Sequence, residues 1–225
     1  MKTFDNLKIT PKSVREQAYE QIRELILNGS FPAGMRLDLV ELCNTFGISK
    51  TPLTEALQKL TRDGLVTVKP RSGTFVSELD PADLEETFGF RLVIELGASE
   101  MILQHITDKQ IHKLKAMNRS MQKILDKKPG NEELFEFLKL DASFHDLLIT
   151  SSGNRLISDH YRQVNSLLLV MRMRDAYSME QYQISVTDHE KIINSLINRD
   201  CTELKCSMKN HIMNAKLNLL EALSS

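Results

Sequence analysis

A single β-rich stretch, residues 65–76, interrupts a chain whose apolar residues otherwise recur at helical spacing. Its two runs, LVTV and TFV, flank the turn KPRSG. Two such runs around a turn that contains proline and glycine predict a β-hairpin. No comparable strand pattern follows it in the sequence. We therefore expect a mostly α-helical protein with one small β element.

Three helices are expected before this hairpin. Apolar residues at helical spacing predict the first over residues 13–28, with Ser13 as its N-cap. A short second helix fits residues 39–46, and a third, capped by Ser49, ends at Gly64. Helix, helix, short turn, helix and hairpin is the order of a winged helix-turn-helix, whose third helix enters the DNA major groove.

After the hairpin the sequence indicates helices alone. The stretch SELDPAD at residues 77–83 is the expected linker. It divides the chain into a winged helix-turn-helix unit, residues 1–78, and an all-α bundle of six or seven helices, residues 79–225. The expected helices of the bundle cover residues 81–105, 108–127, 132–150, 154–176, 180–198 and 202–223.

The formal net charge of −1 seems at odds with a nucleic-acid partner, but it averages two opposed parts. Residues 1–76 hold 11 Lys+Arg and 8 Asp+Glu, whereas residues 77–225 hold 18 and 22. A small basic excess in the N-terminal unit suits a weak phosphate-facing surface. Affinity for DNA should then rest on few phosphate contacts, with a moderate salt dependence.

The sequence also indicates a compartment. No apolar run approaches the ~20 residues that span a bilayer, and the start, MKTFDNLKIT, lacks the order of a signal peptide. We expect a cytoplasmic protein with no membrane partner. Cys43, Cys201 and Cys206 are odd in number and have no metal-finger spacing, so free, partly buried thiols are expected rather than disulfides.

Polar residues stand on apolar helix faces at three places in the bundle. Asp141 and His145 are four residues apart and share a face with Phe144 and Leu148. Two further sites of this kind follow. His189 shares its face with Ile192, Ile193 and Leu196, and His211 continues the stripe of Leu204, Met208 and Ala215.

Three imidazoles and one carboxylate are an appropriate ligand set for Zn²⁺, Ni²⁺, Mn²⁺ or Fe²⁺. For each histidine alone, a hydrogen-bonded core residue is the competing interpretation. The remaining histidines fit no such pattern and are expected to be surface or packing residues: His105, His112 and His160.

Residues 26–76 contain ILNGSFPAGMRL, ELCNTFGISKTPLTEALQKLTRDGLV and KPRSGTFV, and resemble the N-terminal domain of GntR-type bacterial transcription regulators. The rest resembles the all-helical FadR-type effector domain (FCD), through RLVIELGAS at 91–99, DASFHDLL at 141–148 and DHEKIINSLINRD at 188–200. The resemblance implies a homodimer that binds a pseudo-palindromic operator in double-stranded DNA. Repression relieved by a metabolite is common in this family.

The resemblance also places six residues against DNA. Near the N-terminus of the recognition helix, or on the wing and before the second helix, they can reach phosphates or base edges. They are Arg36, Ser49, Lys50, Thr51, Thr54 and Arg71. The competing interpretation is that each is a solvated polar residue. The family commonly has arginine where this chain has Lys50 and Thr54, so we predict an operator that differs from its commonest half-site.

In the metal-binding branch of this family an Asp…His…His…His pattern holds a divalent metal. The resemblance carries it over to Asp141, His145, His189 and His211, with zinc as the first expectation. Four protein ligands on an octahedral ion leave two positions, which a small carboxylate-bearing effector can chelate.

Two further residues are candidates for effector binding. Arg91 can pair bidentately with a second carboxylate of the effector, and Asn165 can add a hydrogen bond. Alternatively, Arg91 pairs with Glu95 one turn on. Binding of the effector would shift the bundle and the spacing of the two DNA-binding units.

Two other classes of function stay open. A metal-dependent enzyme could activate water or oxygen at the same ligands, and a regulator could hold a purely structural metal without an effector. The sequence has no nucleophile motif and no Gly-rich phosphate loop, so we expect a regulator and no enzyme.

Overall fold

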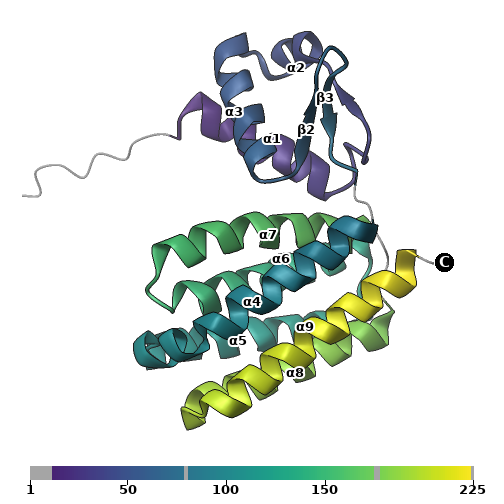
Figure 1. The fold of residues 1–225 in the computed structure, drawn as a ribbon. Helices are drawn as coiled ribbons and strands as arrows, with labels where there is room; N and C mark the ends of the chain where they lie inside the picture. Colours follow the sequence, from purple (N-terminus) through teal and green to yellow (C-terminus); the bar gives the residue numbers. More distant parts are fainter. Residues whose placement is uncertain (1–11, 79–80, 175–177, 224–225) are drawn as a thin grey trace, which may run out of the picture.

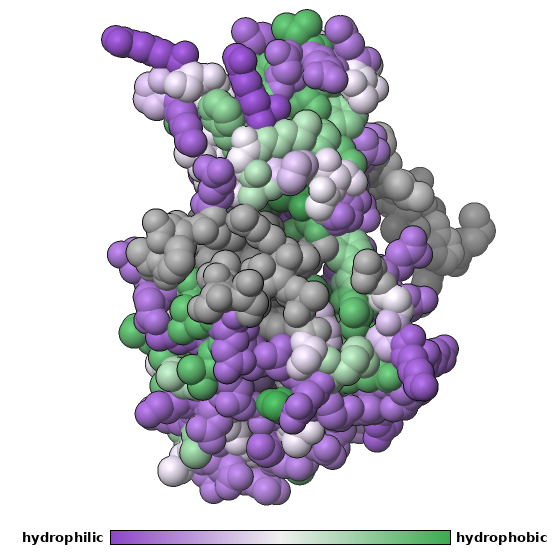
Figure 2. Space-filling view, turned by 90° about the vertical axis from the view of Figure 1, so that its right-hand side faces the viewer, coloured by the Kyte–Doolittle hydropathy of each residue, from purple (hydrophilic) through white to green (hydrophobic). Residues whose placement is uncertain are grey.

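The computed structural model describes residues 12–78, 81–174 and 178–223, which form a small N-terminal lobe and a larger helical bundle (Figure 1). A space-filling view shows the small lobe above the bundle, and on the face in view hydrophilic side chains predominate over the lower part of the bundle (Figure 2). Within the described residues, no helix is long and apolar enough to cross a membrane. The three cysteines are free, with Cys206 exposed rather than partly buried.

The small lobe has the expected order of three helices and a hairpin, with one further strand. Its elements are α1 (Val14–Leu27), β1 (Arg36–Leu37), α2 (Leu39–Phe46), α3 (Lys50–Arg62), β2 (Val66–Lys69) and β3 (Gly73–Val76). The antiparallel sheet has the order β1-β3-β2, and Arg36 pairs with Phe75. The winged helix-turn-helix prediction is therefore confirmed, and β1 is an addition to it.

Local sequence signals account for these helix ends. The Ser13 hydroxyl accepts a hydrogen bond from the Glu16 amide at 3.2 Å and so caps α1, as expected. Gly47, at φ +64°, ends α2 in the left-handed conformation that glycine adopts at little cost. Ser49 occupies the N-cap position of α3, but its side chain makes no capping hydrogen bond.

Within its described residues the bundle has six helices, and the sequence predicted six or seven. They are α4 (Pro81–His105), α5 (Asp108–Leu125), α6 (Asn131–Thr150), α7 (Arg155–Arg174), α8 (Met179–Asn198) and α9 (Cys201–Leu223). Their ends differ from the expected ones by at most two residues where both are described. The expected end of the fourth bundle helix, at Ala176, lies outside the described residues.

Each lobe has its own apolar core. Ile22, Leu53 and Leu60 are fully buried in the small lobe, and Phe144 and Leu148 are among the fully buried residues of the bundle. The end of α1 joins the two lobes, because Leu27 packs with the bundle core and Glu24 lies 3.7 Å from Lys139 of α6. The exact domain boundary, between residues 78 and 79, stays a prediction.

Candidate metal centre and nucleic-acid interface

The first turn of α3 presents polar side chains to solvent. Leu53, Ala56, Leu57 and Leu60 form its buried stripe and hold the helix on the core of the small lobe. Ser49, Lys50 and Thr51 are exposed, and Thr54 is half-buried. The free N–H groups of this helix end, together with a lysine and hydroxyls, can contact phosphates or base edges.

The wing and β1 bring two arginines to the same lobe. The Arg36 side chain crosses the wing at Gly73, where an added Cβ would lie 3.2 Å from Arg36 Nε. Gly73 has φ +126°, so both its conformation and this close approach require glycine. Arg71 lies on the turn of the hairpin, exposed and at φ +62°. That these six polar residues bind DNA stays a prediction.

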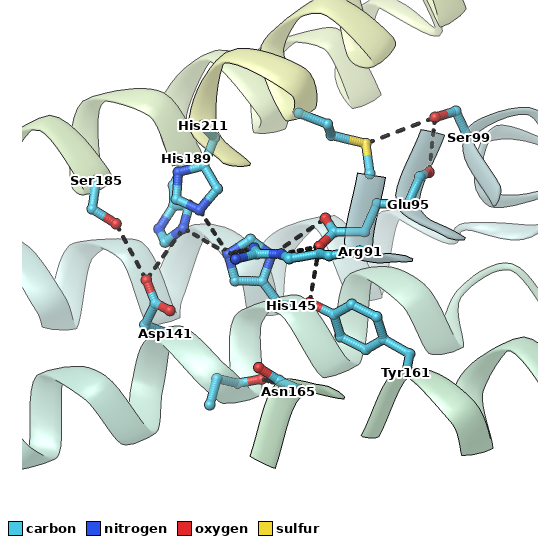
Figure 3. A network of polar contacts seen from close by, with 12 residues as sticks. Arg91, Glu95, Ser99, Asp141, His145, Tyr161, Asn165, Ser185, His189 and His211 are labelled. Carbon is cyan, nitrogen blue, oxygen red and sulfur yellow. Dashed lines mark hydrogen bonds and ion pairs between the residues drawn. The ribbon is translucent and has the colours of Figure 1, made fainter. Parts of the chain in front are cut away.

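In the bundle, the four predicted metal ligands converge on one buried point (Figure 3). Asp141 and His145 come from α6, His189 from α8 and His211 from α9, and each is at most 2% exposed. Their ligand atoms all lie within 4.8 Å of one another. Apolar residues on the same helix faces bury these four polar groups. Their position on apolar faces is what indicated that they point into the core.

The distances within this cluster suit one ion. His145 Nε2 lies 2.9 Å from His211 Nε2 and 3.3 Å from His189 Nε2, which is 3.5 Å from Asp141 Oδ1. Donors that bind one metal at about 2.0–2.2 Å stand roughly 3.0–3.5 Å apart, so these atoms need little movement. Burial, with the neighbouring His189 and His145, lowers the pKa of His211 well below its usual value. A neutral imidazole has the lone pair that a metal requires.

A buried ion pair borders the cluster. Arg91 and Glu95 of α4, 2% and 0% exposed, pair with each other, which is the alternative that the sequence left open. Arg91 Nη2 also lies 3.3 Å from His145 Nδ1 and 3.2 Å from its Nε2. Burial disfavours the charge of Arg91, but Glu95 outweighs it and raises the pKa of Arg91 further. Arg91 is therefore a fixed cation at the edge of the cluster.

Asn165 lies apart from the network of polar contacts around His145 (Figure 3). Its amide donates a hydrogen bond to the carbonyl of Ala142 at 2.8 Å. The side chain lines a cleft of about 980 Å³ between the two lobes, with Tyr19 and Arg23 of α1 on the opposite wall. A role of Asn165 in binding an effector stays a prediction that these contacts do not favour.

Sequence reasoning missed two contacts of the cluster. The Ser185 hydroxyl donates to Asp141 Oδ1 at 3.2 Å, and the Tyr161 hydroxyl donates to Glu95 Oε1 at 3.1 Å. Ser185 lies four residues before His189 on α8, and this spacing could have indicated it. The other histidines are exposed, as expected: His105, His112 and His160.

Both lobes of the chain match families of known proteins. Residues 14–76 match the family described as bacterial regulatory proteins, gntR family, and residues 86–214 match the FCD domain, which alone spans more than half of the chain. The chain is a GntR-family regulator with an FCD domain. It is a DNA-binding transcriptional regulator of this type, and FCD domains commonly bind metal.

Similar proteins support this assignment. The HTH-type transcriptional regulator YdhC of Bacillus subtilis (strain 168) is 26% identical over 211 residues, which cover 93% of this chain and 91% of YdhC. The HTH-type transcriptional repressor RspR of Escherichia coli (strain K12) is 25% identical over 199 residues, 88% of this chain and 86% of RspR. The structure of E. coli McbR/YncC shares the fold, with a TM-score of 0.80 and 18% identity over 94% of this chain and 99% of that one.

Proposed function

We propose that this GntR/FCD regulator is a homodimeric repressor whose binding to a pseudo-palindromic operator is modulated by a small organic acid at a divalent metal. One observation carries the proposal. Four buried donors, three imidazoles and a carboxylate, converge beside the permanent cation of Arg91. A metal held there supplies Lewis-acid positions for a carboxylate.

Zinc is the first expectation for the metal, with nickel, manganese and iron as competitors, because imidazole suits all four. His145 Nε2 is one of the donors that face the other ligands, and Arg91 Nη2 lies 3.2 Å from it. An acid with two carboxyl groups can therefore meet the metal with one and the guanidinium with the other. Arg91 is the effector residue with the stronger support, and Asn165 the weaker.

On the DNA side, the exposed first turn of α3 is the reading surface in this proposal. Ser49, Lys50 and Thr51 would contact phosphates or base edges, and Thr54 a neighbouring position. Lysine offers one point charge and threonine a hydroxyl and a methyl group, whereas arginine binds guanine with two hydrogen bonds. Selection from a random DNA pool should return an operator other than the commonest family half-site, and recovery of that half-site would count against this part.

The dimer has support on α4. Phe90 and Val93 of this helix are 43% and 73% exposed, and nothing lies within 4 Å of a Cβ added at Gly97. These three residues lie on one exposed side of α4, whereas Arg91 and Glu95 of the same helix face the core. A second copy of the chain would bury these apolar groups and set two DNA-binding units at a fixed spacing.

The decisive experiment measures the affinity of the metal-loaded and metal-free protein for DNA from beside its own gene, across a panel of organic acids. The wild type should respond to one acid only when loaded. His189→Ala and His211→Ala should lose the metal in elemental analysis and lose the response. His112→Ala is the matched control, because His112 is exposed and bonds only its own helix in the described contacts.

The same experiment separates the alternatives. Metal-dependent thermal stability without any response to the acids would indicate a structural metal. Turnover of one of the acids would indicate an enzyme. A full response from the metal-free protein would exclude the metal as part of the receptor.

A further inference from the structure

The two carboxylate oxygens of Glu95 differ in their hydrogen bonding. Oε1 pairs with Arg91 Nε and accepts a hydrogen bond from the Tyr161 hydroxyl at 3.1 Å. Oε2 is buried and has no hydrogen-bond partner among the described residues. It lies 3.7 Å from His145 Nδ1 (Figure 3). A buried carboxylate oxygen without a hydrogen-bond donor lowers the stability of the fold, so the direction of Oε2 toward His145 needs a physical explanation.

The ring of His145 supplies one. Its Nε2 faces the Nε2 atoms of His211 and His189, at 2.9 and 3.3 Å, and is thus the nitrogen directed at the shared metal position. An imidazole that uses the Nε2 lone pair must carry its hydrogen on Nδ1. That hydrogen then points away from the cluster, toward α4.

Arg91 cannot accept this hydrogen. Its Nη2 lies 3.3 Å from His145 Nδ1, but a guanidinium only donates hydrogen bonds. Oε2 of Glu95 is the acceptor that the described residues place near Nδ1, and a shift of well under an ångström from 3.7 Å closes the bond. The guanidinium of Arg91 pairs with the Glu95 carboxyl group and favours its ionised form, which accepts hydrogen bonds only.

We infer that Glu95 is a positioning residue of the metal centre: its Oε2 accepts the Nδ1 hydrogen of His145 and so directs Nε2 of His145 at the metal. The inference rests on the proposed metal site. A carboxylate behind a ligating imidazole fixes its tautomer and orientation and raises its basicity. Because Glu95 lies on α4, the helix that follows the wing, this bond also ties a metal ligand to the element next to the DNA-binding lobe.

The test measures zinc affinity by competition with a chromophoric chelator. Glu95→Gln should bind zinc 10- to 100-fold more weakly than the wild type, as is typical when such an outer partner is lost. Glu100→Gln is the matched control and should stay within twofold. It makes the same change on the same helix, at an exposed carboxylate that pairs with Lys205 at 2.7 Å. Equal affinity of Glu95→Gln and the wild type would overturn the inference.

Two further measurements cover a variant that fails to fold. In Arg91→Met/Glu95→Gln the arginine is no longer buried without its carboxylate, and the same loss of affinity is expected. In the zinc-loaded wild type, NMR of the imidazole nitrogens should show a His145 Nδ1–H that exchanges slowly with water. A His145 with its hydrogen on Nε2 would overturn the inference. A wild type that binds no zinc would instead refute the proposed metal site.

Discussion

The two lobes use polar residues in opposite ways. In the small lobe the side chains proposed to face DNA are exposed or half-buried, and none is needed to hold a neighbour in the core. In the bundle the polar residues around His145 are at most 2% exposed and contact one another. Exposed polar groups cost little to change, whereas buried ones leave partners unsatisfied. Substitutions should therefore separate function from stability in the first lobe and link them in the second.

The largest effect is expected when the buried ion pair is broken. Arg91→Met leaves the Glu95 carboxylate, 0% exposed, without its cation. Removing one partner of such a pair typically costs about 3–5 kcal/mol. The free energy of unfolding, from urea titration of the metal-free protein, should fall by that amount. Replacing both residues, as Arg91→Met/Glu95→Leu, should recover much of the loss.

An exposed ion pair in the bundle is the control for the buried pair of Arg91 and Glu95. Arg162 of α7 pairs with Asp146 at 2.9 Å, but its side chain is 52% exposed. Arg162→Met makes the same chemical change at the surface, and exposed pairs contribute about 0–1 kcal/mol. A loss as large as that of Arg91→Met would show that burial does not set the difference between the two pairs.

The second effect falls on DNA affinity alone. Lys50 is exposed at the first position of α3, and Lys50→Ala should weaken operator binding by about 1–3 kcal/mol if the lysine contacts a base. The free energy of unfolding should change by less than about 0.5 kcal/mol, as is usual at the surface. Fluorescence anisotropy with operator DNA and urea titration measure the two quantities. Unchanged affinity would remove Lys50 from the reading surface.

Most of the fold could be predicted, because its signals are local. Caps such as Ser13, terminators such as Gly47 and helical periodicity set the helix limits to within two residues where described. Strand β1 could not be predicted, because two residues, Arg36 and Leu37, carry no period. It exists only through its pairing with Phe75 and Thr74 of β3, far along the chain.

The candidate site divides in the same way. The four cluster residues could be chosen because each lies on an apolar helix face, and a polar group there must meet other polar groups in the core. The sequence could not decide whether Arg91 pairs with Glu95, because the spacing of the two residues is the same whether the pair is buried or exposed. The contact of Tyr161 with Glu95 depends on how α7 packs against α4, and no local pattern of the sequence encodes that.

A pH series should sharpen the contrast inside the bundle. Because the folded protein lowers the pKa of His211, the unfolded chain binds a proton that the folded one rejects. The stability of the metal-free protein should thus fall as the pH drops below about 6.5, by up to about 1.4 kcal/mol per pH unit.

The pH range in which His211 changes the stability differs from the range in which Glu95 does. The pKa of Glu95 is lowered to about 2, so its contribution is complete above about 4.3 and is lost only below it. Urea titrations at pH 7.5, 6.5 and 5.5 measure the slope. His211→Gln should have a smaller slope than the wild type, and His112→Ala the same slope. An unchanged slope in His211→Gln would assign the proton to another group.

The smallest effect is expected at the wing, where the rule that exposed positions are neutral is tested most closely. Arg71 is exposed but stands at φ +62°, which strains a residue with a Cβ by about 1–2 kcal/mol. Arg71→Gly relieves the strain, and the greater freedom of glycine in the unfolded chain offsets about 0.5–1 kcal/mol of that. The free energy of unfolding should therefore rise by about 0–1.5 kcal/mol. The slope of log affinity against log salt should fall by about one per DNA-binding unit, whereas Arg71→Lys should keep it. An unchanged slope in Arg71→Gly would mean that the wing arginine does not contact phosphate, and the polar surface of this lobe would then be confined to α3 and β1.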